Sequence, residues 1–367
     1  MPYPDLDTPS VLVDLDILER NIAEMAALAG REGVALRPHI KTHKTPQIAK
    51  MQLEAGAAGV TCAKIGEAET LADAGIDDIF ICFPLVTELK ARRLASLARR
   101  ARVSTIVDSP QGVAALSAVF ADEPAPLEVL VKVNTGLDRV GVLPEEAVPL
   151  AQRVAEAPGL RFGGVCAHEG YTYGKSDPAE RAAVGRKGGE TLVATARAIE
   201  AAGLPCPRVS VGSTPGSGSA DSVPGVTEMR PGNYVFYDLM QVGMHVVPPE
   251  RCALHVLVTV ASHAARDRAV VDAGSKTFTS DKGAHGMSGA TGFGLVLGKE
   301  DIEIERLSEE HGWLRLDPAG SDVAIGEQLE VIPVHACPVA NLAPELILVR
   351  GGEVVDRWPV AARGCVR

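Results

Sequence analysis

The fold class of this chain follows from the stretch Val103-Ser104-Thr105-Ile106-Val107-Asp108-Ser109-Pro110. Its first five residues are mostly β-branched, which predicts a buried strand. Asp or Ser directly before Pro is a typical helix start, because the polar side chain caps the helix and proline fits its first turn. A strand that runs straight into a capped helix is one unit of a parallel α/β fold.

The same unit recurs along the first two-thirds of the chain. Apolar, strand-like runs occupy residues 34–36, 59–62, 79–82, 103–107, 129–133, 162–166, 208–211 and 234–236. Between them lie amphipathic segments with helical spacing, such as residues 15–29 and 179–202. Eight strand–helix repeats predict a (β/α)8 TIM-like barrel whose active face is formed by the carboxyl ends of its strands. A doubly wound open sheet is the alternative.

The pattern changes after Asp238. Residues 252–260, 269–272 and 328–332 are β-rich with no long helix between them, and residues 346–355 predict a hairpin around Gly351-Gly352. We therefore expect an α/β barrel over residues 1–240 and a C-terminal all-β domain over residues 241–367. The first residues of the chain are expected to pair with the β-domain. The polar, glycine-rich residues 280–286 predict a mobile loop.

The composition of the chain excludes several partners. Its 367 residues include 36 basic and 47 acidic side chains, a net charge of -11, so neither nucleic acid nor a membrane surface is an expected partner. No apolar run approaches the roughly 18 residues of a membrane helix. The first residues have no signal-peptide pattern. Seven cysteines without regular spacing do not indicate a disulfide framework, which predicts a cytoplasmic protein.

A group of basic residues follows the first predicted strand, in residues 37–41 (Arg-Pro-His-Ile-Lys). An extended backbone would turn Arg37, His39 and Lys41 to one face. Three basic groups inside a barrel need an anion or a cofactor. Burial and neighbouring cations lower the pKa of a lysine and make it nucleophilic. The alternatives are a solvated loop, or Lys44 in the covalent role.

A histidine and a cysteine lie two residues apart near the other end of the chain. An extended segment would direct His335 and Cys337 at one point. Imidazole and thiolate together suit zinc, with open positions left for water or substrate, and manganese or magnesium stays open. Two ligands are too few for a structural zinc site, which favours a catalytic metal. The alternative is a buried cysteine beside an unrelated histidine.

A glycine-rich turn follows the seventh predicted strand. Residues 211–219 (VGSTPGSGS) supply the backbone N–H groups and hydroxyls that a phosphate needs. Phosphate sites of barrels recur after strands seven and eight, so Gly212, Ser213 and Thr214 are candidate phosphate ligands. A flexible linker is the alternative. The chain has no Walker-type motif, which speaks against ATP.

Three stretches together resemble the D-serine dehydratase and D-threonine aldolase family. They are residues 7–10 (Asp-Thr-Pro-Ser), 37–44 (Arg-Pro-His-Ile-Lys-Thr-His-Lys) and 335–338 (His-Ala-Cys-Pro). The resemblance extends over nearly the whole chain. It implies pyridoxal phosphate as the cofactor and an alanine-racemase-like barrel with a C-terminal β-domain. It also implies that Lys41 binds the cofactor covalently.

The resemblance extends to the other candidate site residues. Arg139, at the end of the fifth predicted strand, would donate to the phenolic oxygen of the cofactor. His168 and Glu169, after the sixth strand, are the catalytic candidates beside Lys41. The remaining cofactor-binding candidates are His39, Tyr173, Gly212, Ser213, Thr214, Gly232, Asn233 and Tyr234. The metal ligands would be His335 and Cys337.

The resemblance leaves two chemistries. A dehydratase removes the α-proton and the β-hydroxyl, which gives a 2-oxo acid and ammonia. An aldolase breaks the Cα–Cβ bond, which gives glycine and an aldehyde. The family's aldolases have Asp where this chain has Cys337, and a histidine where it has Glu169, which favours a D-serine dehydratase-like lyase. A shift of one residue, to His168, would reverse the second inference. The resemblance further implies a D-amino acid substrate and a homodimer.

Two other classes fit less well. A non-enzymatic carrier of pyridoxal phosphate would resemble the barrel alone, whereas this chain continues with β-rich residues after Asp238. An amino-acid racemase would need a second base, usually a tyrosine from the β-domain, and the chain has no tyrosine after Tyr237. A racemase would also require no metal.

Overall fold

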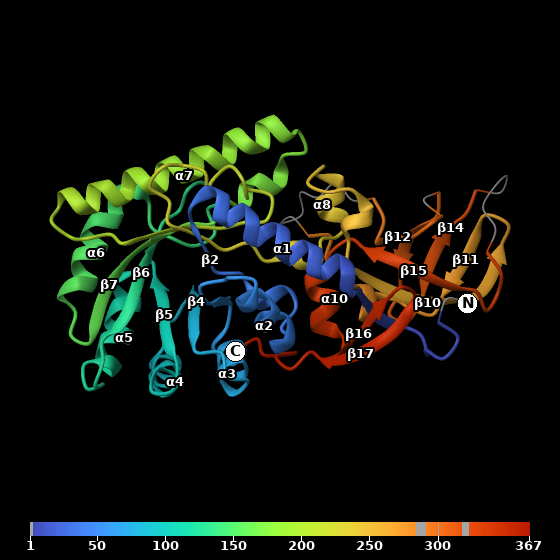
Figure 1. The fold of residues 1–367 in the computed structure, drawn as a ribbon, viewed down its shortest axis with the longest axis horizontal. Helices are drawn as coiled ribbons and strands as arrows, with labels where there is room; N and C mark the ends of the chain where they lie inside the picture. The colour runs from blue at the N-terminus through green and yellow to red at the C-terminus, as the bar shows by residue number, and fades with distance from the viewer. Residues whose placement is uncertain (1–2, 284–290, 300, 318–322) are drawn as a thin grey trace.

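The structure is a computed structural model that describes residues 3–283, 291–299, 301–317 and 323–367. It contains two sheets. Figure 1 shows the parallel sheet and its helices at one end of an elongated molecule, and the second sheet at the other end. Among the described residues, no helix is both long and apolar enough to cross a membrane.

The first sheet has eight parallel strands in the order β2-β9-β8-β7-β6-β5-β4-β3. An isolated bridge between His39 and Thr61 links the segment after β2 to β3, so the two ends of the sheet approach each other. The strands are β2 (Ala35–Leu36), β3 (Val60–Cys62), β4 (Asp78–Pro84), β5 (Arg102–Val107), β6 (Leu127–Lys132), β7 (Leu160–Cys166), β8 (Arg208–Val211) and β9 (Glu228–Met229).

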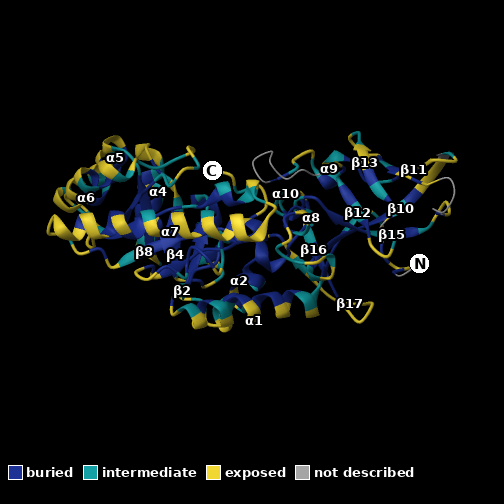
Figure 2. Ribbon diagram, turned by 90° about the horizontal axis from the view of Figure 1, so that it is seen from above, coloured by how far each residue is buried: buried dark blue, intermediate teal, exposed yellow. Residues whose placement is uncertain are grey.

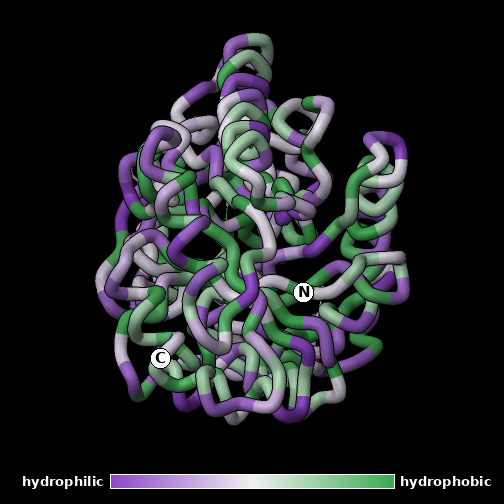
Figure 3. Tube along the Cα trace, turned by 90° about the vertical axis from the view of Figure 1, so that its left-hand side faces the viewer, coloured by the Kyte–Doolittle hydropathy of each residue, from purple (hydrophilic) through white to green (hydrophobic). Residues whose placement is uncertain are grey.

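Helices cover the outside of this sheet. They are α1 (Leu15–Glu32), α2 (Pro46–Glu54), α3 (Ile65–Asp73), α4 (Glu88–Ala98), α5 (Pro110–Phe120), α6 (Ala147–Glu156) and α7 (Pro178–Ala201). The helix start predicted before Pro110 is confirmed, because Ser109 Oγ accepts from the Gly112 N–H at 3.2 Å. In Figure 2 the outer face of α7 is exposed, and in Figure 3 hydrophilic and hydrophobic residues alternate along this uppermost helix.

The predicted eighth strand is wrong. Residues 234–236 do not form a strand; Asn233–Val235 is a 3-10 turn whose apolar side chains are buried. The eighth strand is instead β9, which contains the charged residue Glu228. Glu228 is only 3% exposed and is neutralised inside the sheet by Arg37 and Arg208. The hydrophobicity of residues 234–236 therefore predicted a strand where a buried turn lies. The charged residue Glu228 kept β9 from being predicted.

The second sheet has the order β11-β14-β13-β12-β15-β10-β1-β16-β17. Strand β10 pairs with both β15 and β11, which closes six strands into a ring. Strand β1 (Ser10–Asp14), from the start of the chain, pairs with β10 and β16. The other strands are β10 (Leu254–Ala265), β11 (Arg268–Val271), β12 (Gly294–Val296), β13 (Glu303–Leu307), β14 (Gly312–Arg315), β15 (Gln328–Pro333), β16 (Glu345–Arg350) and β17 (Glu353–Pro359).

The predicted hairpin is confirmed. Strands β16 and β17 are antiparallel, and Gly351 (φ 59°) and Gly352 (φ 82°) take the left-handed conformations that a tight hairpin turn requires. The second part of the chain is not purely β, however. It contains α8 (Leu239–Gly243), α9 (Ser275–Phe278) and α10 (Ala336–Leu342). Of the loop predicted at residues 280–286, positions 284–286 lie outside the described residues.

Candidate active site

Lys41 lies where the first strand of the parallel sheet ends, but not on an extended backbone as predicted. It belongs to a 3-10 turn (Ile40–Thr42) in which His39 Nδ1 accepts from the Lys41 N–H at 3.4 Å. Arg37 also departs from the prediction, since it binds Glu228 (2.8 Å) and Asp78 (2.7 Å). Protein carboxylates therefore neutralise Arg37, and only His39 and Lys41 are left for a cofactor.

The environment of Lys41 favours the uncharged amine. Its side chain is accessible to solvent, but protein atoms surround the amine. Burial lowers the pKa of Lys41, and the charge of Arg139 lowers it further, while the Cys337 thiolate opposes both. Burial and the charge of Lys41 likewise hold the pKa of His39 well below its usual range. A lowered pKa makes the uncharged form of the lysine amine easier to reach, and this form is the nucleophile.

His168 and Glu169 follow β7 and point to different surroundings. His168 Nδ1 is hydrogen-bonded to the Gly212 carbonyl, so Nδ1 carries the proton and Nε2 is left as an acceptor. Burial, followed by the charge of Lys41, holds the pKa of His168 well below its usual range. Glu169 is fully buried, and its Oε2 accepts from the Gly212 N–H at 3.0 Å. Burial raises the pKa of Glu169. Of the two, His168 lies in the electrostatic field of Lys41.

The turn after β8 is tightly packed against the end of the sheet. A Cβ on Gly212 would lie 2.9 Å from Arg230 Cβ, so only glycine fits at this position. The Ser213 hydroxyl accepts from the Gly216 N–H at 3.1 Å and holds the turn closed. Within the part of the chain that the structure describes, the N–H groups of Ser213 and Thr214 have no hydrogen-bond acceptor. Two neighbouring free donors are what a phosphate group would accept.

Gly232, Asn233 and Tyr234 form the facing turn. A Cβ on Gly232 would lie 2.9 Å from the His39 carbonyl, so this backbone too is close to the strand end that carries Lys41. The Tyr234 N–H donates to Thr214 Oγ1 at 3.2 Å, which joins the two turns. The Tyr234 side chain points into the core, where it is fully buried and its hydroxyl accepts from Gln52 at 2.9 Å. Only the backbone of Tyr234 therefore reaches the site.

Two further cofactor candidates, Arg139 and Tyr173, lie within electrostatic range of each other. Arg139 is exposed, and its charge acts on both Lys41 and Tyr173. The Tyr173 ring packs against Met240 and Met244. Burial raises the pKa of Tyr173, and the Cys337 thiolate adds to this effect. The phenol is thus a neutral group near the histidine–cysteine pair.

The histidine–cysteine pair begins α10, where an extended segment was predicted. His335 precedes the helix and Cys337 lies in its first turn, because Asp238 Oδ2 accepts the Ala336 N–H at 3.0 Å and starts the helix there. Cys337 Sγ is 3.3 Å from Thr42 Oγ1, which directly follows Lys41. The fold therefore places the segment that carries Lys41 next to the histidine–cysteine pair, although the two are far apart in the sequence.

The electrostatics of the pair favour a thiolate. Burial opposes ionisation of Cys337, but the neighbouring His335 outweighs it and holds the pKa of the thiol below its usual range. Burial would lower the pKa of His335, but the Cys337 thiolate and Asp281 raise it to about 11. Asp281 Oδ2 lies 3.4 Å from His335 Nδ1. In the described ranges, no group of three or more His, Cys, Asp or Glu residues is arranged to hold a metal.

Asp238 is a site residue that the sequence did not reveal. It is fully buried and accepts hydrogen bonds from Asn233 (2.7 Å) and Ala336 (3.0 Å), so one carboxylate links the cofactor-side turn to the histidine–cysteine pair. It also caps α8 by accepting from Gln241. The only sequence signal was that cap, an Asp directly before an amphipathic segment, and it gives no hint of the link to α10.

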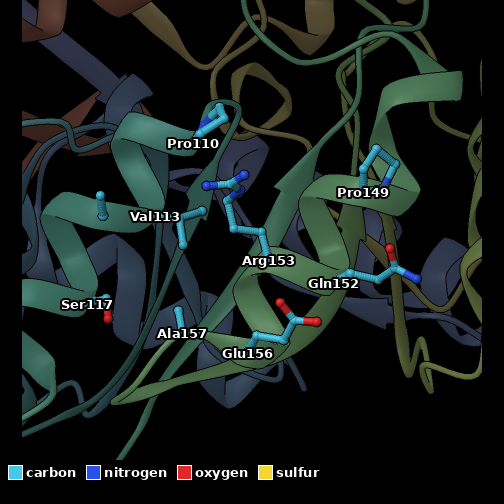
Figure 4. A pocket seen from close by; sticks show the side chains of 9 residues that line it. Pro110, Val113, Ser117, Pro149, Gln152, Arg153, Glu156 and Ala157 are labelled. Atoms are coloured by element: carbon cyan, nitrogen blue, oxygen red, sulfur yellow. The ribbon is translucent and has the colours of Figure 1, made fainter.

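Two hollows in the surface lie away from Lys41. One, of about 460 Å³, lies between α5 and α6 and is lined by residues such as Val113, Ser117 and Arg153 (Figure 4). The other, of about 400 Å³, lies at the amino ends of the strands around Arg37 and Arg208. Neither contains a nucleophile with a perturbed environment. The carboxyl ends of the strands therefore remain the candidate active site.

A lysine at the carboxyl ends of a parallel sheet, facing a second β-rich sheet, defines an alanine-racemase-like architecture. Residues 13–239 match the family model described as "Alanine racemase, N-terminal domain". Residues 253–349 match the model described as "Putative serine dehydratase domain". The chain belongs to the D-serine dehydratase and D-threonine aldolase family, as its sequence motifs predicted.

Individual relatives cover nearly the whole chain. A D-threonine aldolase of Arthrobacter is 36% identical over 100% of this chain and 95% of its own length. A D-threo-3-hydroxyaspartate dehydratase of Delftia is 35% identical over 96% and 97%. The crystal structure of D-threonine aldolase from Filomicrobium marinum has a TM-score of 0.90 and 37% identity over 99% and 97%. A variant of the hydroxyaspartate dehydratase, solved in a metal-free form, has a TM-score of 0.90 and 33% identity over 97% of each chain.

Proposed function

We propose that this protein is a pyridoxal-phosphate- and divalent-metal-dependent lyase that removes water from D-β-hydroxy-α-amino acids, with D-serine as the simplest substrate. The products would be a 2-oxo acid and ammonia. One observation carries the proposal: Thr42 Oγ1, next to Lys41, is 3.3 Å from Cys337 Sγ. A nucleophilic lysine and a pair of metal-binding side chains can therefore act on neighbouring atoms of one small substrate.

The residues present fit pyridoxal phosphate. The N–H groups of Ser213 and Thr214, which have no acceptor among the described residues, suit its phosphate. Gly212 and Gly232 leave room where a Cβ would meet Arg230 or the His39 carbonyl. Lys41 would bind the cofactor covalently, Arg139 would donate to its phenolic oxygen, and His39, His168 and Tyr173 would contact its ring. When bound, this cofactor supplies an electron sink for the negative charge that develops at the substrate Cα.

The histidine–cysteine pair fits a divalent cation, with zinc preferred over manganese or magnesium. An imidazole and a thiolate are donors that zinc favours. A metal held by only His335 and Cys337 would keep positions open for the substrate hydroxyl and would supply Lewis acidity there. The existence of a relative solved in a metal-free form is consistent with a metal site in this family.

Each residue then has a limited task. The Lys41 amine, whose pKa burial lowers, takes the α-proton from one face of the substrate, which restricts turnover to one enantiomer. His335 and Cys337 orient the β-hydroxyl, and Asp238 holds this pair against the cofactor-side turn. Glu169 is assigned to the support of the phosphate turn through its bond to the Gly212 N–H rather than to proton transfer.

D-Threonine aldolase activity is the second candidate. The Arthrobacter aldolase and the Delftia dehydratase match this chain almost equally well, at 36% and 35% identity. The imidazole of His168, with Nε2 free to accept a proton, is a group that could remove the β-hydroxyl proton as an aldolase requires. Cys337 in place of the family aldolases' aspartate is the feature that favours dehydration.

The proposal includes three further points of organisation. Within residues 1–240, strands β2 to β9 and their helices form a closed (β/α)8 barrel with the His39–Thr61 bridge as the closure, whereas β1 belongs to the second sheet. Residues 241–367 form the domain that carries the metal ligands. The enzyme is a homodimer of the cytoplasm. Cross-linking and sedimentation of the purified enzyme test the last point.

Product analysis tests the reaction. The enzyme, loaded with pyridoxal phosphate and zinc, is incubated separately with D-serine and D-threonine, with the L-enantiomers as controls. Pyruvate and ammonia from D-serine support dehydration, whereas glycine and acetaldehyde from D-threonine support the aldolase. Lys41→Ala should abolish the yellow absorbance of the bound cofactor, and Cys337→Ala should abolish turnover but keep that absorbance. Full activity of Cys337→Ala after chelation would exclude the metal assignment.

A further inference from the structure

A row of ion pairs lies at the amino ends of the parallel strands, at the opposite end of the sheet from Lys41. Arginines and carboxylates alternate along this row, and each member is bonded to the next. In order, the members are Arg102, Asp78, Arg37, Glu228, Arg208, Glu128 and Arg161. All but Arg37 stand at the first or second position of a strand. Because four arginines face three carboxylates, the row has one positive charge in excess.

Both ends of the row are arginines with unused hydrogen-bond donors. Among the described residues, Arg102 and Arg161 each bind a single carboxylate, and each does so through Nη2 alone. Their side chains are 79% and 57% exposed, so a dissolved ion can reach the remaining N–H groups. The inner members differ, since Arg37 and Arg208 each lie between two carboxylates and are mostly buried. Only the two terminal arginines are therefore short of a partner.

The two terminal arginines line the same hollow of about 400 Å³. Cavities of this size hold small organic molecules rather than a single inorganic ion. Part of the lining is apolar and comes from Phe120, which ends α5, and from Pro126 and Leu127, which lead into β6. The hollow therefore combines positive charge with apolar surface.

The other charged side chains of this hollow do not compete for an anion or repel one strongly. Arg99 and Glu123 form a bidentate pair, with bonds of 3.1 and 2.8 Å, and balance each other. Asp78 and Glu128 also line the hollow, but each is bonded to two arginines of the row. The charge left for a ligand is thus positive.

We propose that this hollow binds a small dicarboxylate, with Arg102 and Arg161 each holding one of its carboxylate groups. A guanidinium group with free N–H donors matches a carboxylate in both charge and geometry. The ligand would give each terminal arginine a second carboxylate, as Arg37 and Arg208 already have. Its carbon chain would cover the apolar lining, which inorganic phosphate cannot do. This assignment does not depend on the reaction proposed above.

Isothermal titration calorimetry of the purified enzyme, with its cofactor bound, tests the proposal. The probes are malonate, succinate, glutarate and adipate, in which the spacing of the two carboxylates grows stepwise. Butyrate, which has a single carboxylate, is the control for carboxylates in general. At least one dicarboxylate should bind about tenfold more tightly than butyrate or better, because it makes a second charge-assisted pair.

Single variants locate the binding. Arg102→Gln and Arg161→Gln should each weaken the binding of the best dicarboxylate about tenfold or more. The matched control is Arg92→Gln, since Arg92 is 68% exposed, pairs with Glu88 on α4 and does not line the hollow. That variant should bind the dicarboxylate as the wild type does. All three arginines are exposed, so the variants should fold, and an unchanged Tm checks this.

A carboxylate that enters the candidate active site instead would change the cofactor absorbance and would still bind to both hollow variants. The proposal is overturned by that result, by full affinity in either Arg102→Gln or Arg161→Gln, or by an equal loss in Arg92→Gln. It is also overturned if butyrate binds as tightly as every dicarboxylate, or if none of the four dicarboxylates gives saturable binding. The last two results need only the wild-type enzyme, so a folding defect in a variant leaves the proposal testable.

Discussion

Replacing Glu228 by glutamine should remove the charge that holds the amino ends of the parallel strands together. Glu228 Oε2 is 2.8 Å from Arg37 Nε, its Oε1 is 3.0 Å from Arg208 Nη2, and Ser210 donates to the same carboxylate at 2.6 Å. The side chain is 3% exposed. Glutamine keeps the shape, but it leaves two guanidinium groups facing a neutral amide.

The magnitude follows from the acidity of this carboxyl. Burial would raise the pKa of Glu228, but Arg208 and Arg37 outweigh it and lower the pKa from 4.5 to about 2. At about 1.4 kcal/mol for each tenfold change in acidity, ionisation in the folded protein contributes about 3 kcal/mol. Because the folded-state pKa is the lower one, this contribution is present above pH 4.5 and is lost as the pH falls towards 2.

Urea denaturation at pH 7 measures the effect. Glu228→Gln should lower the free energy of unfolding by about 3 kcal/mol. The matched control is Glu88→Gln, which removes an ion pair with Arg92 in which both side chains are more than 60% exposed. That change should stay within about 0.5 kcal/mol. Equal losses in the two variants would show that the buried network contributes no more than a surface pair, and the argument would fail.

Three further changes have defined outcomes. Burial raises the pKa of Asp221 from 3.8 to about 6, so its ionisation lowers the stability of the folded protein as the pH rises through this range. Asp221→Asn should therefore raise the Tm at pH 7 but hardly change it below pH 3.8. Gly188→Ala would place a Cβ 2.9 Å from Glu169 Cγ and should cost about 1–3 kcal/mol by thermal denaturation, whereas Gly30→Ala, with nothing within 4 Å, should be neutral or stabilising. Asp238→Asn should weaken zinc retention about 10- to 100-fold against a competing chelator, with unchanged affinity as the contrary result.

The fold was predictable where burial and local chemistry agree. Val103 to Val107 is buried on both faces, as a strand covered by helices must be, and Ser109 caps the helix that follows. The prediction failed at β9, because Glu228 faces inward and its partner Arg37 is 191 residues away. An ion pair between β9 and the residue that follows its neighbour β2 cannot be inferred from the hydrophobicity of either segment.

For the candidate site too, the residues were easier to predict than their geometry. Lys41 and Gly212 could be selected as candidates from the chemistry of their residue types, whereas Cys337 was selected with the help of the family resemblance. Their geometry could not: His335 and Cys337 were expected on an extended segment, and the cap from Asp238 turns it into a helix. The Tyr234 side chain, a cofactor candidate, points instead to Gln52, since its backbone alone closes the turn.

The path of the chain limits how this protein can be divided. Strand β1 begins the chain, yet it lies between β10 and β16, and α1 then leads directly away to the other sheet. In a fragment that starts after residue 14, the nine-stranded sheet would be divided into six strands and two strands. The strand edges that β1 covers would then be unpaired. We therefore expect neither part of the protein to keep an intact sheet when it is produced without residues 10–14.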